Sequence, residues 1–500
     1  MDGQAVSWTP QTLGALLGKQ ARERGSVEAV VTPKARVTYK ELLELSGSAA
    51  GKMQAMGLKR GDHVGVLMGN DEKWLSLFYG AALIGAVTVP VNTRFKAAEV
   101  EYCVKQAHCK ALFYVPRFMK QDFESFIEKV EILKVDVSGG LPQGTFEPAD
   151  VSPGDVLLIQ FTSGTTAYPK GVMLTHDMML RDAWAAGTRV GIRPEDRYFN
   201  CRPFFHVAGS TLSALMSLVA GATLVTLRAF EAGPALEMME RERCTLVSGN
   251  DTIFQMLMGH EDFPKRKLWL RGGWAAAGPQ TMRRIIDVLG ARHICAAYGL
   301  SEASPNVVMS DWREPEELRV QGLPLPLPGV EIRIQEAEIQ VRGWNVMKGY
   351  YNNPEATAKA FTEDGWLRTG DLGELTPDGR LRMVGRLKDV FRVGGENVAP
   401  AEVEEVLLAH PAVETAQVIG VPDPRLGEVA CAYVSLKGSV SELDLLDWCK
   451  ARLAGFRVPR YLKIVDSFEN IGMTGSAKVQ KHRLRAQALI DFGLEDTKKT

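Results

Sequence analysis

A glycine-rich segment, Phe161-Thr-Ser-Gly-Thr-Thr-Ala-Tyr-Pro-Lys-Gly-Val172, holds the clearest pattern for chemistry in this sequence. Its amides and hydroxyls can donate hydrogen bonds to phosphate oxygens, Gly164 lets the backbone approach closely, and Lys170 adds a compact positive charge. The spacing differs from the GxxxxGK(S/T) pattern of the Walker loop. An apolar strand precedes the segment and a helix that opens at Thr175 follows it. These features favour a polyphosphate-binding loop, with a polar turn and an exposed lysine as the alternative.

Three charged residues further along stand in short motifs, and each has an ordinary structural role as its alternative. Glu302 ends Tyr298-Gly-Leu-Ser-Glu302, where an acid can hold a cation, cap a helix or lie on the surface. Asp371 ends Gly365-Trp-Leu-Arg-Thr-Gly-Asp371 and is also a good turn residue. Lys478 can place an ammonium group in a site or simply be solvated.

The motifs together resemble the signatures of the adenylate-forming superfamily: acyl-CoA synthetases, peptide-synthetase adenylation domains and firefly-type luciferases. The segments quoted above resemble the family's TSGTTxxPKG, YGxTE and GWxxTGD. Gly385-Arg-Leu-Lys-Asp-Val-Phe-Arg-Val-Gly-Gly-Glu-Asn397 resembles GRxKDxxxxGGEN, and Lys478-Val-Gln-Lys-His-Arg-Leu-Arg485 resembles the C-terminal lysine motif. Because five motifs occur in order between about residue 28 and residue 485, the chain is identified as a member of this family.

The resemblance implies an ATP site. Lys478, Glu302 and Arg386 are expected to be catalytic, with Lys478 between the acid's carboxylate and the α-phosphate and Arg386 on the ribose or phosphate side. Asp371 is expected to accept hydrogen bonds from the ribose, and Tyr298 to lie against adenine. The expected ATP- and AMP-binding residues are Thr162, Ser163, Gly164, Thr165, Thr166, Lys170, Tyr298, Gly299, Ser301, Asp371 and Arg386. Glu302 and Thr165 are expected to hold Mg²⁺, which prefers hard oxygen ligands.

Pro203-Phe-Phe-His-Val-Ala-Gly209 resembles the segment that lines the family's acyl pocket. Amino-acid-activating members place an aspartate near here, whereas this chain has His206, so the resemblance implies an acid without an amino group. His206 is expected to gate or contact the acid, with a packed or solvated histidine as the alternative. The expected pocket residues are His206, Gly209, Asn250, Ala296, Ala297 and Asn306, with Thr252 and Val307 nearby. These small or mildly polar residues favour a mid-sized apolar acid that is medium-chain, alicyclic or aromatic.

The resemblance also implies that the C-terminal part rotates between two orientations, one for each chemical step. Lys388 matches the hinge position, and Lys478 is expected to face the site during adenylation. Gly394, Gly395 and Glu396 are expected to line a tunnel for CoA in the second orientation.

The chain departs from the family pattern at a few positions. Ala167 and Ala477 replace glycines, and Asp251 stands where many members have proline. If position 167 needs a positive φ, alanine there costs about 1 kcal/mol. The effect of these departures on loop motion is left open.

The elements that must position these residues follow from the hydrophobic pattern. Thr38 to Glu41 fits a capping box before a helix, and apolar strands alternate with helix-sized segments from about residue 62 to residue 249. Such alternation predicts βαβ units and a parallel sheet. We therefore predict an α/β fold. Its large N-terminal domain, 1–387, has stacked parallel and mixed sheets with helices, and its small mobile α+β C-terminal domain, 388–500, carries the hinge, the GGEN loop and the catalytic lysine.

The composition excludes several classes of partner. The 500 residues include 59 Lys and Arg against 60 Asp and Glu, a net charge of −1, which gives no reason to expect nucleic acid or an anionic membrane. The 7 cysteines are scattered, without a CxxC pair, which indicates reduced thiols and no zinc site. We see no signal peptide and no apolar run of about 20 residues, the length that spans a bilayer. A cytoplasmic protein is expected, and a homodimer is a further option.

The sequence thus predicts an ATP-dependent acyl-CoA synthetase that uses Mg²⁺ and CoA. A carboxylic acid and ATP would give acyl-AMP and pyrophosphate, and the CoA thiol would then give acyl-CoA and AMP. One alternative is an enzyme that loads a carrier-protein pantetheine. A luciferase-like oxygenase and an inactive AMP-binding homologue are the others.

Overall fold

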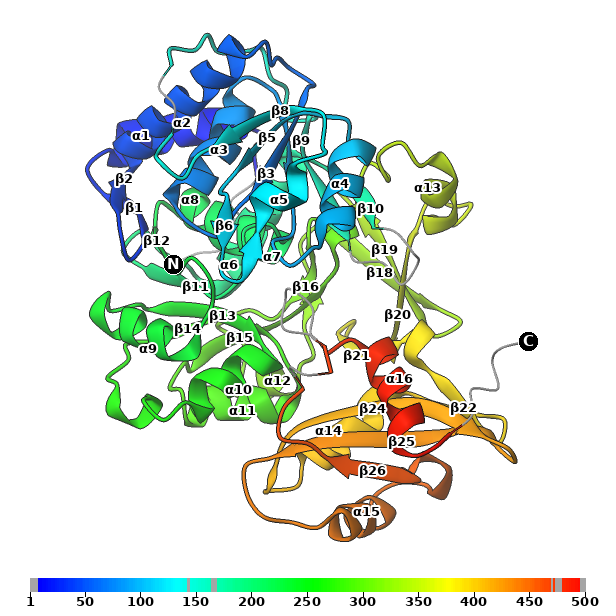
Figure 1. The fold of residues 1–500 in the computed structure, drawn as a ribbon. Coiled ribbons are helices and arrows are strands. Elements are labelled where there is room, and N and C mark those ends of the chain that lie inside the picture. Colours follow the sequence, from blue (N-terminus) through cyan, green and yellow to red (C-terminus); the bar gives the residue numbers. More distant parts are fainter. Residues whose placement is uncertain (1–7, 142–143, 163–168, 469–470, 473–478, 495–500) are drawn as a thin grey trace.

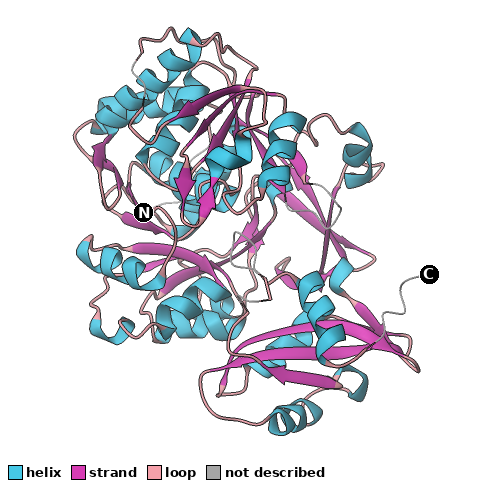
Figure 2. Ribbon diagram, viewed as in Figure 1, coloured by secondary structure: helices cyan, strands magenta, loops and turns pink. Residues whose placement is uncertain are grey.

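The computed structural model describes residues 8–141, 144–162, 169–468, 471–472 and 479–494. Figure 1 shows a large body built by the blue to yellow-green part of the chain and a smaller body built by the orange and red part. Strands lie at the centre of the large body with helices around them (Figure 2). The predicted α/β class, with a large N-terminal and a small C-terminal domain, is confirmed. The boundary at residues 387 and 388 stays a prediction.

The largest sheet in the described residues has nine strands. Strands β11 to β15 run parallel to one another and to β1, and β2, β16 and β17 are antiparallel to their neighbours. β12 and β13 are buried at every position because helices cover both faces of a parallel sheet. In spatial order the strands are β17 (Leu325–Pro326), β16 (Asn306–Met309), β15 (His293–Gly299), β14 (Gly272–Ala276), β13 (Leu246–Asn250), β11 (Arg197–Asn200), β12 (Thr223–Thr226), β1 (Glu28–Val31) and β2 (Arg36–Thr38).

A second sheet of six strands lies beside it in the large body. It is parallel except at β10, which pairs antiparallel with β9. In spatial order the strands are β10 (Lys170–Thr175), β9 (Val156–Thr162), β4 (Val87–Pro90), β3 (His63–Leu67), β5 (Cys109–Tyr114) and β8 (Leu133–Asp136). The predicted alternation of strands and helices, with a parallel sheet, is therefore confirmed in this region. A short hairpin, β6 (Arg117–Phe118) and β7 (Gln121–Asp122), follows β5.

Helices connect these strands and cover the sheets. The predicted capping box at Thr38 is present. The Thr38 hydroxyl accepts a hydrogen bond from the Glu41 amide, and the Glu41 carboxylate accepts one from the Thr38 amide. The helices of the large body are α1 (Leu13–Arg24), α2 (Tyr39–Ala55), α3 (Glu72–Leu83), α4 (Ala97–Gln106), α5 (Phe123–Ile127), α6 (His176–Val190), α7 (Val207–Gly209), α8 (Met216–Ala220), α9 (Ala232–Arg241), α10 (Asp251–Gly259), α11 (Pro279–Asp287), α12 (Glu316–Val320) and α13 (Pro354–Ala360). A π-helical segment, Ser210–Leu215, joins α7 to α8, and short 3₁₀ turns occur at Phe263–Lys265 and Ser301–Ala303.

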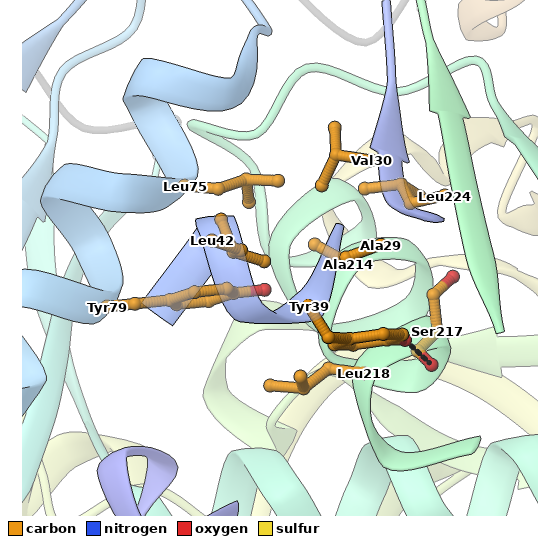
Figure 3. A pocket seen from close by; sticks show the side chains of 10 residues that line it. All are labelled: Ala29, Val30, Tyr39, Leu42, Leu75, Tyr79, Ala214, Ser217, Leu218 and Leu224. Atoms are coloured by element: carbon orange, nitrogen blue, oxygen red, sulfur yellow. Dashed lines mark hydrogen bonds between the residues drawn. The ribbon is translucent and has the colours of Figure 1, made fainter. Parts of the chain in front are cut away.

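The core between α2, α3 and α8 is closely packed. A cavity of about 10 Å³ lies there, lined mostly by apolar side chains (Figure 3). Beside it the Tyr39 hydroxyl donates a hydrogen bond to the Ser217 carbonyl over 3.3 Å. A cavity of that size has room for roughly one water molecule. It is therefore a packing void and not a pocket for a substrate.

A four-stranded antiparallel sheet, which the sequence did not predict, leads to the C-terminal body. Its strands are β18 (Val330–Gln335), β19 (Glu338–Gly343), β20 (Leu367–Leu375) and β21 (Leu381–Arg386). A 3₁₀ turn, Leu387–Asp389, then joins β21 to the C-terminal strands.

The C-terminal residues form a five-stranded sheet with an apolar core of its own, from Phe391 to Ala488. The strands are β22 (Phe391–Val393), β23 (Glu396–Val398), β24 (Val413–Asp423), β25 (Gly427–Leu436) and β26 (Tyr461–Ile464), and the helices are α14 (Pro400–Leu408), α15 (Glu442–Lys450) and α16 (Lys481–Asp491). A 3₁₀ turn lies at Gly455–Arg457. This α+β arrangement matches the prediction, except that α16 was not foreseen. All 7 cysteines of the chain are buried and free of disulfides. Among the described residues, the helices are too short or too polar to cross a membrane.

Candidate active site

Several predicted site residues lie where the parallel strands of the nine-stranded sheet end. β13, β14 and β15 are neighbours, and they end at Asn250, Ala276 and Gly299. The segment from Pro203 to Gly209 follows β11, the neighbour of β13 on its other side. Ligands of open α/β sheets bind at the carboxyl ends of the strands. The fold therefore brings most acyl-pocket candidates and the segment after Tyr298 to one edge.

His206 is held by the start of the short helix that follows it. Its Nδ1 accepts a hydrogen bond from the Ala208 amide over 3.1 Å, so His206 acts as the N-cap of α7. The side chain is half-buried, and Gly209 closes the same turn in a buried position. Because Nδ1 is an acceptor here, a neutral imidazole carries its proton on Nε2.

Asn250 and Asp251 mark the change from β13 to α10. The Asn250 side chain caps α10 through the Ile253 amide over 3.1 Å. The Asp251 carboxylate accepts a hydrogen bond from the Gly278 amide over 3.2 Å and thereby ties α10 to the loop after β14. Burial raises the pKa of Asp251 above its usual range, and the nearby carboxylate of Glu404 adds to the rise. Asp251 thus serves the packing of two loops at this edge.

Small residues occupy the end of β15, where Ala296 belongs to one apolar core cluster and Ala297 packs against the other, on the opposite face of the strand. Ala296 is buried, Ala297 is half-buried, and the Ala296 amide donates a hydrogen bond to the Ser310 hydroxyl over 2.8 Å. Gly299 faces the chain after it so closely that an added Cβ would stand 1.9 Å from the Pro305 carbonyl oxygen. Glycine at this position is therefore required by the close approach of two backbones. Asn306, at the start of β16, is buried.

Three nucleotide candidates meet in one cluster. The Tyr298 hydroxyl donates a hydrogen bond to Asp371 Oδ2 over 2.8 Å, and Arg386 Nε lies 3.2 Å from Asp371 Oδ1. Asp371 and Arg386 are directly opposite each other on β20 and β21. Burial and the negative charge of Asp371 raise the pKa of Tyr298 well above its usual range, so the phenol stays a donor. The cluster presents a buried carboxylate and a half-exposed guanidinium together.

Glu302 lies in the 3₁₀ turn after β15, together with Ser301. Its Oε1 accepts a hydrogen bond from the Tyr350 hydroxyl over 2.9 Å. In the described part of the chain no three acidic, histidine or cysteine side chains come together as a metal cage. Mg²⁺ commonly uses only one or two protein carboxylates, with phosphate oxygens and waters as its other ligands. One half-buried carboxylate with a second oxygen available therefore fits Mg²⁺ held jointly with a phosphate.

The two ends of the glycine-rich segment are held by strand pairing. Thr162, the last residue of β9, pairs with Lys170, the first residue of β10. Ser163, Gly164, Thr165, Thr166 and Ala167 lie outside the described residues. The predicted helix does open at Thr175, which caps α6 through the Met178 amide. A strand, β10, intervenes before that helix, so the segment joins two antiparallel strands and is not a direct strand-to-helix turn.

The C-terminal candidates occupy short turns. Lys388 lies in the 3₁₀ turn between β21 and β22. Gly394 and Gly395 form the tight turn between β22 and β23 with φ of +59° and +96°, and Glu396 begins β23. Two consecutive positive φ angles are typical of a two-residue hairpin turn, which favours glycine at both positions. Ala477 and Lys478 lie outside the described residues.

Sequence reasoning missed two residues that contact the candidates. Tyr350 binds Glu302, and Asp182 of α6 accepts the Asn306 amide over 3.0 Å while being fully buried. Burial raises the pKa of Asp182 well above its usual range. The contact of Tyr350 depends on the pairing of its segment with β10, which no local pattern reveals. A lone aspartate on an amphipathic helix gave no signal for the second.

Comparison with known proteins identifies the family. The family model described as AMP-binding enzyme matches residues 17–351, and that described as AMP-binding enzyme C-terminal domain matches residues 402–478. A CoA ligase of Rhodococcus jostii, named for a methyl-dioxo-octahydro-indenyl propanoyl substrate, is 35% identical over 96% of this chain and 99% of its own. The mitochondrial medium-chain acyl-CoA ligase ACSF2 of Bos taurus is 30% identical over 95% of this chain and 87% of its own.

Solved structures of CoA ligases also match nearly the whole chain. o-Succinylbenzoate CoA synthetase (MenE) from Bacillus subtilis, in complex with its acyl-adenylate intermediate, has a TM-score of 0.82 and 28% identity over 96% of this chain and 98% of its own. The anthranilate CoA ligase AuaEII in complex with anthranoyl-AMP shares the fold with a TM-score of 0.89, at 24% identity over 99% of this chain and 100% of its own. The chain therefore belongs to the AMP-binding enzymes, the adenylate-forming superfamily.

Proposed function

We propose that this chain, an ATP-dependent acyl-CoA synthetase, activates a mid-sized apolar carboxylic acid that is medium-chain, alicyclic or aromatic. The observation that carries the proposal is the pair of small residues Ala297 and Gly299, at alternate positions of β15, beside the Tyr298–Asp371–Arg386 cluster. Their lack of bulk would leave room for an acyl group next to the nucleotide. His206 would contact or gate that group from the segment after β11.

Adenylation comes first, because a carboxylate is a poor electrophile. One carboxylate oxygen of the acid attacks the α-phosphorus of ATP, and the bond to the β-phosphate oxygen breaks to release pyrophosphate. The product, acyl-AMP, carries a good leaving group. This step brings an anion to a polyanion, so cations aimed at the transferring group stabilise its transition state. Lys170, Arg386 and Lys478 are the residues that we assign to this role.

Glu302 and Thr165 would hold Mg²⁺, and the bound ion would neutralise charge on the phosphates. Asp371 would accept hydrogen bonds from the ribose hydroxyls, with Arg386 across the sheet on the same side. The other proposed nucleotide contacts are Thr162, Ser163, Gly164, Thr166, Tyr298, Gly299 and Ser301. Their roles rest on the sequence motifs.

Thioester formation follows at the same site. The CoA thiol attacks the acyl carbon of acyl-AMP, AMP leaves with the electron pair of the acyl–oxygen bond, and the thiol proton goes to solvent. A thiol with a pKa near roughly 8.5 supplies enough thiolate at neutral pH without a dedicated base. Gly394, Gly395 and Glu396 would line the path of the pantetheine arm after the C-terminal domain, 388–500, turns about Lys388.

A panel of acids tests the substrate class. Pyrophosphate release from ATP and Mg²⁺ is measured with straight-chain acids of increasing length, alicyclic acids, aromatic acids and amino acids, each with and without CoA. The proposal predicts the highest kcat/KM among mid-sized apolar acids, with acyl-CoA as the product. A preference for amino acids or for long chains contradicts it. Acid-dependent release without any acyl-CoA would favour a carrier protein as the acceptor.

The cytoplasmic location and the homodimer expected from the sequence remain predictions. Sedimentation of the purified chain measures the oligomeric state directly.

A further inference from the structure

Tyr350 stands between two groups that the proposed chemistry needs at a fixed separation. Its backbone belongs to a segment, 347–351, that is hydrogen-bonded to two site elements at once. The Met347 amide donates to the Glu302 carbonyl over 2.9 Å, and the Tyr351 amide donates to the Gly171 carbonyl over 2.7 Å. An isolated bridge joins Val172 to Tyr350. The segment therefore spans from the Glu302 turn to β10, the strand that Lys170 begins.

The Tyr350 side chain contacts both groups. Its hydroxyl donates to Glu302 Oε1 over 2.9 Å, and Lys170 Nζ lies 5.1 Å from the centroid of its ring. An ammonium within about 6 Å of a ring centroid is attracted by the negative face of the ring. One rigid aromatic side chain thus fixes a carboxylate and a cation relative to each other.

We propose that Tyr350 is a positioning residue that sets the Glu302 carboxylate against the Lys170 ammonium, and that it thereby couples Mg²⁺ binding to the binding of the ATP phosphates. The inference rests on the roles proposed above for Glu302 and Lys170. By engaging Oε1, Tyr350 aims Oε2 of Glu302 toward the metal. By lying under Lys170, its ring limits the positions open to the ammonium.

The neighbouring tyrosine provides a matched control. Tyr351 is also half-buried in the same segment, but its hydroxyl lies 3.1 Å from His108 Nδ1 and its ring packs on His63. The change Tyr351→Phe removes the same hydroxyl from the same backbone segment. It leaves Glu302 and Lys170 with all of their contacts to Tyr350.

The test measures the affinity for ATP by calorimetry, first with EDTA and then with excess Mg²⁺, in the wild type and in Tyr350→Phe. Loss of a hydrogen bond to a charged group predicts that the gain in ATP affinity given by Mg²⁺ falls about fivefold. Affinity with EDTA stays at the wild-type value, since the ring still contacts Lys170. Tyr350→Leu removes the ring as well, so affinity with EDTA also falls. Tyr351→Phe leaves both affinities unchanged.

Kinetics give the second readout. In the pyrophosphate assay, Tyr350→Phe should need about five times more Mg²⁺ for half-maximal rate. The proposal is overturned if Tyr350→Phe is less stable but keeps the wild-type dependence of rate and ATP affinity on Mg²⁺. It is also overturned if the ATP affinity of the wild type is the same with EDTA and with Mg²⁺. A wild type that binds MgATP but releases no pyrophosphate with any acid contradicts the proposed function instead. In that case the calorimetric comparison still decides the role of Tyr350.

Discussion

At the scale of single residues, two hydrogen bonds from a tyrosine to a carboxylate orient side chains of the candidate site. Tyr298 binds Asp371, and Tyr350 binds Glu302. In both pairs the tyrosine pKa is raised, so each phenol remains a donor that orients the carboxylate. The two acids and Tyr298 were predicted from local motifs. Tyr350 was not, because its contact with Glu302 depends on a strand pairing, that of 347–351 with β10, which no local pattern reveals.

Lys478 carries the sharpest prediction at this scale. Lys478→Ala should nearly abolish pyrophosphate release, because the ammonium between the acid and the α-phosphate is needed only while acyl-AMP forms. The variant should still convert pre-made acyl-AMP and CoA to acyl-CoA. Both half-reactions are measured on the same preparation, so the second serves as the control for folding. An equal loss in both would refute the assigned role.

At the scale of elements, the carboxyl ends of parallel strands place several candidate residues together, and α6 contacts β16 beside them. The carboxyl ends of β13, β14 and β15 are adjacent because the strands are neighbours in the sheet. The sequence predicted a parallel sheet and the strand that became β13, but not β14 or β15. The four-stranded sheet before the hinge was not predicted, since its strands do not alternate with helices. The buried contact of α6 with β16 through Asp182 also needed the fold.

The contact between α6 and α1 gives a prediction about pH. His176 is fully buried, and its Nδ1 accepts the Leu13 amide over 3.1 Å, which satisfies a donor in the first turn of α1. Burial lowers the pKa of His176 from 6.5 to about 4. Between these values the unfolded chain binds the extra proton, so this group's contribution to stability is present above pH 6.5 and is lost as the pH falls toward 4.

The free energy of unfolding is measured with urea at about pH 8 and at about pH 5. Protonation of His176 in the unfolded chain should lower it by ~2 kcal/mol between these two pH values. His176→Asn keeps an acceptor for the Leu13 amide but does not titrate. The free energy of unfolding of this variant should therefore decrease by ~2 kcal/mol less than that of the wild type over the same pH interval. The control is His482→Asn, on an exposed position of α16, which should follow the wild type. Parallel pH curves for the wild type and His176→Asn would show that the buried histidine is not responsible.

At the scale of the whole molecule, the C-terminal body contacts the large body, and the two orientations that the family resemblance implies stay a prediction. The Thr415 hydroxyl of β24 donates to Gln255 Oε1 of α10 over 3.0 Å, a contact across the two bodies. The link between them runs through Lys388 in its short 3₁₀ turn. The sequence predicted the separate C-terminal unit from its change of pattern. It did not predict how the two bodies pack, because that packing depends on contacts between residues far apart in the sequence.

A proline at the hinge tests the rotation. Proline fixes φ near about −65° and removes an amide, so Lys388→Pro should restrict the turn. We expect adenylation to be reduced little and thioester formation to be reduced strongly, because only the second step needs the domain to turn. Lys388→Ala is the control, since it removes the charge and leaves the backbone free. A second half-reaction as fast in the proline variant as in the alanine variant would contradict a hinge at this residue.

The most direct measurement is the product balance with the best acid of the panel. ATP, CoA and the acid are incubated with the enzyme, and AMP, ADP, pyrophosphate and acyl-CoA are quantified together. Two steps in one site predict one AMP and one pyrophosphate for every acyl-CoA, with acyl-AMP accumulating on the enzyme when CoA is left out. The release of ADP and phosphate in place of AMP and pyrophosphate, or acyl-CoA without AMP, would contradict the adenylate mechanism.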